Sequence, residues 1–256
     1  MATERKIIGF DRRIRLDWLD ATADWVAQGL AVAEVRARLE RLLDGKVAGE
    51  GFHSARGKTI TVLLHIWARL PESLLPLRDD GLALLGERSG RDRLPLHWGM
   101  CLATYPFVRD VARITGRLLS LQGAAAHSQI ARRMAESWGE RSTSTRAVQR
   151  VLRSFVDWGV VAESGERGVF SPAPRITVSA GDRLGLWLTE AGISNGEGRV
   201  RPFRRVVGDS SFFPLELKLS LREVAESPRL EVYRQGLDED LLVLKTTASQ
   251  RLLPAS

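Results

Sequence analysis

The sequence predicts a mainly α-helical protein with small β-hairpins. Apolar residues recur at helical spacing through residues 1–122, and a strongly amphipathic helix follows at 144–156. Two pairs of short β-rich runs around turn residues form hairpin patterns at 160–170 and 230–244. One-sided apolar periodicity marks a helix that packs by one face, whereas paired runs around a turn mark a hairpin. We therefore expect three domains: a helical domain (1–122), a central module of helices and a hairpin (123–180), and a smaller mixed α/β domain (181–256).

The composition is that of a basic protein of ordinary hydrophobicity. The 256 residues include 44% hydrophobic and 27% charged side chains, as expected for a folded chain of two or three domains. The net charge is +7 and the sequence pI about 10.2, with arginine far outnumbering lysine. A basic chain attracts polyanions, and guanidinium groups bind phosphate and guanine in bidentate fashion. Arginine excess is also typical of GC-rich bacterial genomes, so the charge alone does not assign a partner.

The cysteine count and the hydropathy pattern exclude several classes of protein. The single cysteine, Cys101, excludes an intramolecular disulfide and a cysteine-ligated zinc site within one chain. The sequence contains no signal-peptide pattern and no apolar run of about 18 residues. We expect a cytoplasmic bacterial protein with no membrane segment, metal or cofactor.

The first 122 residues predict six helices. Their apolar repeats run through 14–26, 32–42, 60–67, 74–85, 94–102 and 107–119. Proline, which lacks an N–H and starts or ends helices, stands at the breaks: Pro71, Pro76, Pro95 and Pro106. We expect the tryptophans of this half to form a bundle core: Trp18, Trp25, Trp67 and Trp98.

The segment 144–156 has a clean amphipathic pattern. At about 100° per residue, apolar and polar side chains separate onto opposite faces. The apolar stripe consists of Val148, Val151, Leu152 and Phe155, and the polar face of Arg146, Gln149, Arg150 and Arg153. Guanidinium and amide groups match phosphates and major-groove base edges. The polar face is therefore a candidate nucleic-acid contact.

Turn and hairpin patterns flank this helix. Upstream, Ser128 is placed to cap a helix over 129–138, and Ser142, Thr143 or Ser144 could cap the next one. Downstream, Trp158-Gly159 ends the helix, and 160–162 and 168–170 bracket a hairpin loop. The order of helix, tight turn, helix and hairpin over residues 127–170 resembles the winged helix-turn-helix superfamily.

The resemblance implies a contact surface for double-stranded DNA. In that superfamily the second helix enters the major groove, while neighbouring elements hold the phosphates. It implies that Thr145, Arg146, Gln149, Arg150 and Arg153 face the groove, and that Arg167 with Arg132 or Arg133 holds phosphates. The alternative is that the module serves as a dimerisation surface.

Residues 181–256 predict a smaller mixed α/β unit, but their patterns do not decide its arrangement of helices and strands. The segment 184–188 fits a helix or a strand, and helical and alternating patterns overlap in 213–224. A hairpin joins 230–233 to 241–244. A helix before that hairpin would repeat the central order, so a second winged helix is one alternative. Its acidic loop and mixed helix charges suit a protein partner better than DNA: Asp238, Glu239 and Asp240 in the loop, and Glu216, Lys218, Arg222 and Glu223 on the helix.

One enzymatic pattern occurs in this region. Asp209 followed by Glu216-Leu217-Lys218 has the residue order of the metal-dependent nuclease signature. In that signature carboxylates hold Mg²⁺ and the lysine stabilises the attacking water or the transition state. Glu216 and Lys218 share a face if the segment is a strand. The alternative, which we favour, is the surface of an amphipathic helix.

Two further patterns predict structure rather than chemistry. The run Gly57-Lys58-Thr59 lacks the earlier glycine that a P-loop requires, because Phe52 occupies that position. We expect a polar loop that leads into the third helix. The histidines lack metal-ligand spacing, and we expect His65 and His97 to be core or boundary residues.

Taken together, the patterns favour a non-enzymatic double-stranded DNA-binding protein. A helical domain joined to a winged helix is loosely similar in layout to the small DNA-binding subunit of bacterial BREX phage-exclusion systems, which implies a phage-defence accessory factor. A transcription regulator is equally compatible. Two alternatives stay open: an assembly subunit that binds protein partners through its C-terminal domain, and a Mg-dependent nuclease.

Overall fold

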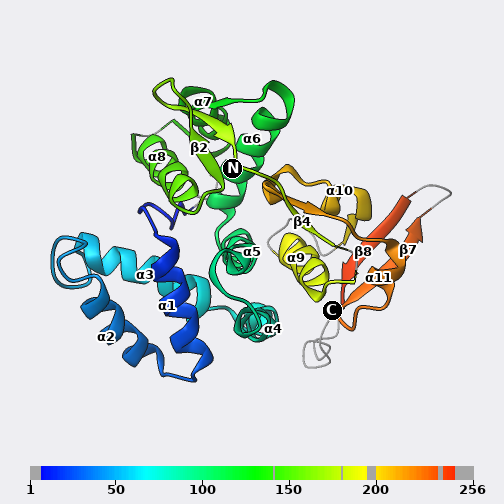
Figure 1. Cartoon of the computed structure of the whole chain (residues 1–256), viewed down its shortest axis with the longest axis horizontal. Helices are drawn as coiled ribbons and strands as arrows, with labels where there is room; N and C mark the ends of the chain where they lie inside the picture. Colours follow the sequence, from blue (N-terminus) through cyan, green and yellow to red (C-terminus); the bar gives the residue numbers. More distant parts are fainter. Residues whose placement is uncertain (1–6, 141, 180, 195–199, 236–238, 246–256) are drawn as a thin grey trace, which may run out of the picture.

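The computed structural model is mainly α-helical with small β-sheets, which confirms the predicted fold class. It describes residues 7–140, 142–179, 181–194, 200–235 and 239–245. Within these residues, none of the helices is long and apolar enough to cross a membrane. Figure 1 shows the N-terminal helices on one side, the central helices and hairpin above them, and the C-terminal strands on the other side.

The described residues 7–122 contain six α-helices, as predicted. They are α1 (Leu16–Ala27), α2 (Val32–Leu42), α3 (Ala55–Trp67), α4 (Leu75–Gly86), α5 (Leu94–Thr104) and α6 (Pro106–Gln122), with short 3-10 helices η1 (Glu72–Leu74) and η2 (Gly90–Arg93). Pro76, Pro95 and Pro106 each lie in the first turn of a helix. The missing N–H costs nothing there, because the first-turn N–H groups have no partner within the helix.

Helix α5 lies at the centre of the molecule (Figure 1) and is buried from Leu94 to Ala103. Trp98, on this helix, contacts aromatic rings from both later parts of the chain, Phe155 at 4.7 Å and Phe213 at 5.5 Å between ring centroids. One hydrophobic cluster consequently extends from Phe10 to Leu217. This larger core therefore crosses the predicted boundaries at 122/123 and 180/181.

The central segment forms two helices and a three-stranded antiparallel sheet. Its elements are β1 (Ala125–Ala126), α7 (His127–Trp138), α8 (Ser142–Asp157), β2 (Val161–Glu163) and β3 (Val169–Pro172). The sheet order is β1-β3-β2, with Ala125 opposite Phe170 and Val161 opposite Pro172. The predicted helix and hairpin are confirmed. The prediction that Ser128 caps the first helix is wrong, because α7 begins at His127 and the Gln129 side chain accepts a hydrogen bond from the Ala126 N–H instead.

In the C-terminal segment, the structure decides between the helix and strand patterns that overlap in the sequence. It contains β4 (Ile176–Val178), α9 (Arg183–Ser194), β5 (Val200–Pro202), α10 (Phe203–Val207), η3 (Ser210–Phe212), β6 (Leu215–Leu217), α11 (Leu221–Ala225), β7 (Leu230–Gln235) and β8 (Glu239–Leu244). Strand β6 pairs in parallel with β4, and β7 and β8 form the predicted hairpin. The segment 184–188 is helical. The overlap in 213–224 is a strand followed by a helix, so a single helix through Glu216 and Glu223 is wrong, and Asp238 of the predicted loop lies outside the described residues.

The central and C-terminal sheets share one topology. In each sheet the first strand pairs with the third and the third with the second, giving β1-β3-β2 and β5-β8-β7. Each first strand lies between two helices, α6 and α7 or α9 and α10, and a further helix, α8 or α11, precedes the hairpin. The second unit differs by the insertion of η3 and β6 and by its small separate core, which contains Ile193, Val206, Val224, Leu230 and Leu242.

Candidate nucleic-acid interface

Helix α8 presents one buried and one exposed side. The predicted apolar stripe of Val148, Val151, Leu152 and Phe155 is buried, and Ala147 and Ser154 extend it. The exposed side of the helix carries Ser142, Thr143, Thr145, Arg146, Gln149 and Arg153. No acid occurs among these exposed residues. The residue before Ser142, where a helix cap would lie, is outside the described residues, and Ser142, Thr143 and Ser144 all belong to the helix itself.

Arg150 is not part of this free face. Its guanidinium donates a hydrogen bond of 2.6 Å to the Asp11 carbonyl oxygen and lies 3.8 Å from an oxygen of the Asp11 carboxylate. The prediction that Arg150 shares the polar face with Arg146, Gln149 and Arg153 is therefore corrected: Arg150 lies at the margin of that face, where Asp11 holds it. The extended segment before α1 covers that margin, a contact between residues far apart in the sequence that periodicity does not reveal.

Two further polar residues of α8 hold the same segment. The buried Ser154 hydroxyl accepts from the Ile14 N–H at 2.9 Å, and the Asp157 carboxylate accepts from the Leu16 N–H at 3.3 Å. Asp157 also pairs with Arg13 at 2.9 Å. Arg150, Ser154 and Asp157 lie at i, i+4 and i+7, so they form one strip along the helix. The sequence pattern did not predict this strip. Its signal in the sequence is a polar residue, Ser154, beside the apolar stripe.

The other predicted phosphate contacts lie on the elements around α8. Arg132 is exposed and Arg133 half-buried on α7, and Arg167 is exposed in the loop between β2 and β3. That loop also exposes Glu166 next to Arg167, so its tip is of mixed charge. Among the described residues, no acid forms an ion pair with Arg132, Arg133, Arg146, Arg153 or Arg167.

A basic recess of about 530 Å³ lies beside the first turns of α8. Arg146, Arg150 and Thr143 of α8 line one side, while Asp11 and Arg12 of the N-terminal segment and Lys58 of α3 line the others. Nothing in the sequence pattern connects these three segments. Lys58 belongs to the run Gly57-Lys58-Thr59, which partly matches a P-loop.

The prediction that the run Gly57-Lys58-Thr59 lies in a polar loop is wrong, because α3 already begins at Ala55 and includes all three residues. Ser54 caps α3 by accepting from the Gly57 N–H at 3.0 Å. A side chain at Gly57 would place its Cβ 2.3 Å from the Gly51 carbonyl oxygen, so the loop can fold back only over a glycine. Lys58 is consequently presented from the first turn of a helix rather than from a phosphate-binding loop.

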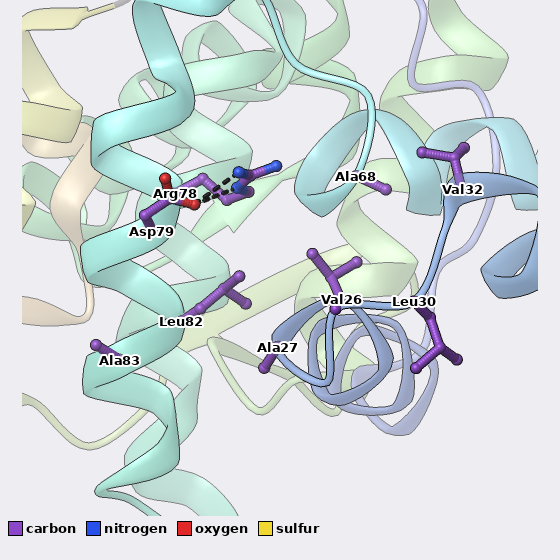
Figure 2. A pocket seen from close by; sticks show the side chains of 10 residues that line it. Val26, Ala27, Leu30, Val32, Ala68, Arg78, Asp79, Leu82 and Ala83 are labelled. Carbon is purple, nitrogen blue, oxygen red and sulfur yellow. Dashed lines mark hydrogen bonds and ion pairs between the residues drawn. The ribbon is translucent and has the colours of Figure 1, made fainter.

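A second hollow is lined mainly by aliphatic residues. It measures about 520 Å³ and lies between the α1–α2 connection, the end of α3 and α4. Figure 2 shows Val26, Leu30 and Leu82 around it, with Arg78 paired to Asp79 at 2.6 Å on its rim. Because both charged groups at this hollow neutralise each other, it offers no free charge for an anionic ligand.

Asp209 of the nuclease pattern is engaged by other groups of the fold. Asp209 caps η3 by accepting from the Ser211 N–H at 2.8 Å and lies 3.9 Å from the Arg109 guanidinium. Burial lowers the pKa of Arg109 to about 10, with Asp209 opposing this shift. Glu216 is half-buried on β6 and Lys218 is exposed. Among the described residues, no group of three His, Cys, Asp or Glu side chains could hold a metal ion.

His97 is a buried core residue, as predicted. Its Nδ1 accepts from the Trp67 indole N–H at 3.1 Å, and its Nε2 lies 3.0 Å from the Asp20 carboxylate. Arg93 bridges Asp20 and Asp24 at 3.3 and 3.0 Å. Burial raises the pKa of Asp20, but His97 and Arg93 lower it more, so the net shift is downward. This network joins α1, α3 and α5 within the helical half.

Comparison with family models, with curated proteins and with solved structures found no match to this chain. Its candidate site therefore has to be interpreted from its own residues.

Proposed function

We propose that this chain is a non-enzymatic, cytoplasmic double-stranded DNA-binding protein that uses α8 as its recognition helix. The observation that carries the proposal is the exposed side of α8. It displays Arg146, Gln149 and Arg153 with hydroxyl residues at its N-terminal turn and no acid, while its apolar side is buried. Arginine pairs with guanine and glutamine with adenine in the major groove, and hydroxyl groups donate to phosphates.

The surrounding topology supports the same proposal. The order α6, β1, α7, α8, β2 and β3 resembles a winged helix, in which two helices and a hairpin present one helix to the major groove. Arg132, Arg133 and Arg167, which pair with no acid of the described residues, lie on neighbouring elements, where phosphate contacts are expected. The net charge of +7 favours association with a polyanion.

A duplex-binding titration over a salt series tests the proposal. Purified protein is expected to bind duplex DNA with an affinity that falls steeply as salt rises, because phosphate contacts release counterions. Arg153→Ala should weaken binding by about 1–3 kcal/mol if the side chain reads a base. Arg41→Ala is the matched control, because Arg41 is an exposed arginine on α2, which Figure 1 shows well away from α8.

Equal binding by the parent and Arg153→Ala, or affinity that is flat across the salt series, would reject α8 as the DNA contact. The same titration with competitor sequences separates the two biological roles that we propose. A transcription regulator should prefer one sequence over random duplex by a large factor. A phage-defence accessory factor that binds through the backbone should show little preference.

An assembly subunit is the second candidate, and the C-terminal unit favours it. Its helix α11 has only five residues, and the exposed Arg222 pairs with the exposed Glu226 directly after the helix at 3.3 Å, so this surface of mixed charge suits a protein partner better than phosphate. Loss of partner binding without loss of DNA binding in Arg222→Glu would support this role for the C-terminal unit.

A further inference from the structure

The basic recess beside α8 combines charges from three separate segments. Arg12, Lys58, Arg146 and Arg150 line it together with one carboxylate, that of Asp11, which leaves a formal excess of three positive charges. Like charges brought together at a recess cost free energy unless an anion or solvent compensates them. The recess therefore has an electrostatic preference for an anionic ligand.

The single acid is already engaged. Its carboxylate lies 3.6 Å from the Arg12 Nε and 3.8 Å from the Arg150 guanidinium. The Arg12 Nε is buried and has no hydrogen-bond partner within the described structure. Lys58 and Arg146 are exposed, and no described acid pairs with either of them. Two cationic side chains of the recess are thus uncompensated.

Arg146 connects this recess with the exposed side of α8. It lines the recess and also belongs to the face that contains Gln149 and Arg153. A ligand that follows the exposed face of the helix toward its N-terminal end consequently reaches Lys58 on α3. Successive phosphates of a DNA strand are about 3.4 Å apart along the axis, so a single strand can contact both places.

We propose that this recess binds a backbone phosphate of the same duplex that α8 contacts, with Lys58 and Arg146 as its principal ligands. The inference rests on the proposed function and extends the interface from the central module onto the helical half. The phosphate oxygens accept charge-assisted hydrogen bonds from the two cations, and Thr143 adds a hydroxyl donor. Such a contact fixes the position of the protein on DNA without reading its sequence.

Lys58→Ala in the full-length protein tests the inference. The measured quantities are the affinity for duplex DNA and the slope of log K against log salt concentration. Loss of one phosphate contact should lower the magnitude of the slope by about 0.9 and weaken binding by roughly five- to tenfold at 0.1 M salt. Lys58→Arg should retain both. Lys46→Ala is the matched control, since Lys46 is an exposed lysine of the helical half outside the recess.

The outcomes separate this inference from the proposed function. If Arg153→Ala weakens binding but Lys58→Ala behaves like Lys46→Ala, the recess contact is refuted and the role of α8 stands. If Lys58→Ala weakens binding and Arg153→Ala does not, the recess contact stands and the role of α8 is refuted. A parent that does not bind duplex refutes both.

A second experiment tests whether the recess binds a free anion instead of a phosphate of the DNA backbone. The probe is inorganic pyrophosphate, added during thermal unfolding of the parent and of Lys58→Ala. Stabilisation of the parent alone, together with unchanged DNA binding by Lys58→Ala, would overturn the inference, because the recess would then be a site for a free anion. An unchanged melting temperature of Lys58→Ala without ligand shows that the substitution leaves the fold intact.

Discussion

The Arg150 guanidinium donates a hydrogen bond of 2.6 Å to the backbone carbonyl oxygen of Asp11. This bond joins the third turn of α8 to the segment before α1, where Ser154 and Asp157 hold the next residues. The recognition helix of the proposed interface is thereby fixed by the helical half of the protein and by its own module. The orientation of this helix depends on contacts on both sides.

Arg150→Ala is expected to destabilise the fold by about 1–2 kcal/mol, because hydrogen bonds to charged groups contribute about 1.5–3 kcal/mol and this side chain is 38% exposed. Chemical unfolding measures the change. Arg146→Ala serves as the control, since Arg146 is exposed on the same helix and should change stability by at most about 0.5 kcal/mol. Equal stability of the two variants would show that the Asp11 contact is unimportant in solution.

The neighbours Leu152 and Arg153 should have separable roles. Leu152 is buried and Arg153 exposed. Leu152→Ala should cost about 2–5 kcal/mol of stability through the cavity that it leaves, and affect DNA binding only through unfolding. Arg153→Ala should keep the melting temperature and weaken binding. Folded Leu152→Ala that loses DNA affinity, measured well below its melting temperature, would contradict this division.

The protein should lose stability as the pH falls below about 6.5. Partial burial lowers the pKa of His127 below its usual value of 6.5, with the backbone of Thr145 opposing the shift. His65 is exposed and not the core or boundary residue predicted, and its pKa is lowered by partial desolvation and by the nearby Arg69. The unfolded chain then binds more protons than the folded one, so acid favours unfolding in this range.

Comparison of the parent with His127→Gln between pH 7.5 and 5.5 isolates the contribution of His127. We expect the melting temperature of the variant to fall less steeply as the pH is lowered. The corresponding difference in the free energy of unfolding should be below about 1 kcal/mol, because the ring is only partly buried. His53→Gln is a control, since His53 is exposed in the loop before α3. Parallel curves for the parent and His127→Gln would contradict the expected neutral state of His127.

We expect no metal-dependent DNA cleavage. Supercoiled plasmid incubated with the protein and Mg²⁺ or Mn²⁺ should stay intact, because the Asp209 carboxylate already caps η3 and lies 3.9 Å from the Arg109 guanidinium. Nicking that disappears in Glu216→Ala and Lys218→Ala, with both variants folded, would instead establish the nuclease alternative.

The sequence by itself determined the elements that depend on local patterns. The apolar stripe of α8 follows directly from the helical period, and both hairpins follow from β-rich runs around turn residues. The prolines of the helical half marked the starts of α4, α5 and α6 for a reason that is equally local. These features are encoded within about one helical turn or one hairpin, so neighbouring residues suffice to predict them.

Strand pairing depended on tertiary structure. Strand β1 has two residues, and β5 and β6 have three each, too few for an alternating pattern to be recognised. Their pairing joins residues far apart in the chain, such as Ile176 with Leu215. The strand pairing that the two sheets share therefore follows from the tertiary structure and not from local sequence patterns.

Tertiary structure also decided which part of the polar face of α8 is free. Arg150 and Arg153 are the same residue type on the same predicted face, yet one holds Asp11 across 139 positions of sequence and the other is exposed. The recess likewise required Arg12, Lys58 and Arg146 to converge from three segments. Helical periodicity states which side chains point away from the core of their own module, but the segment that covers them is set by long-range packing.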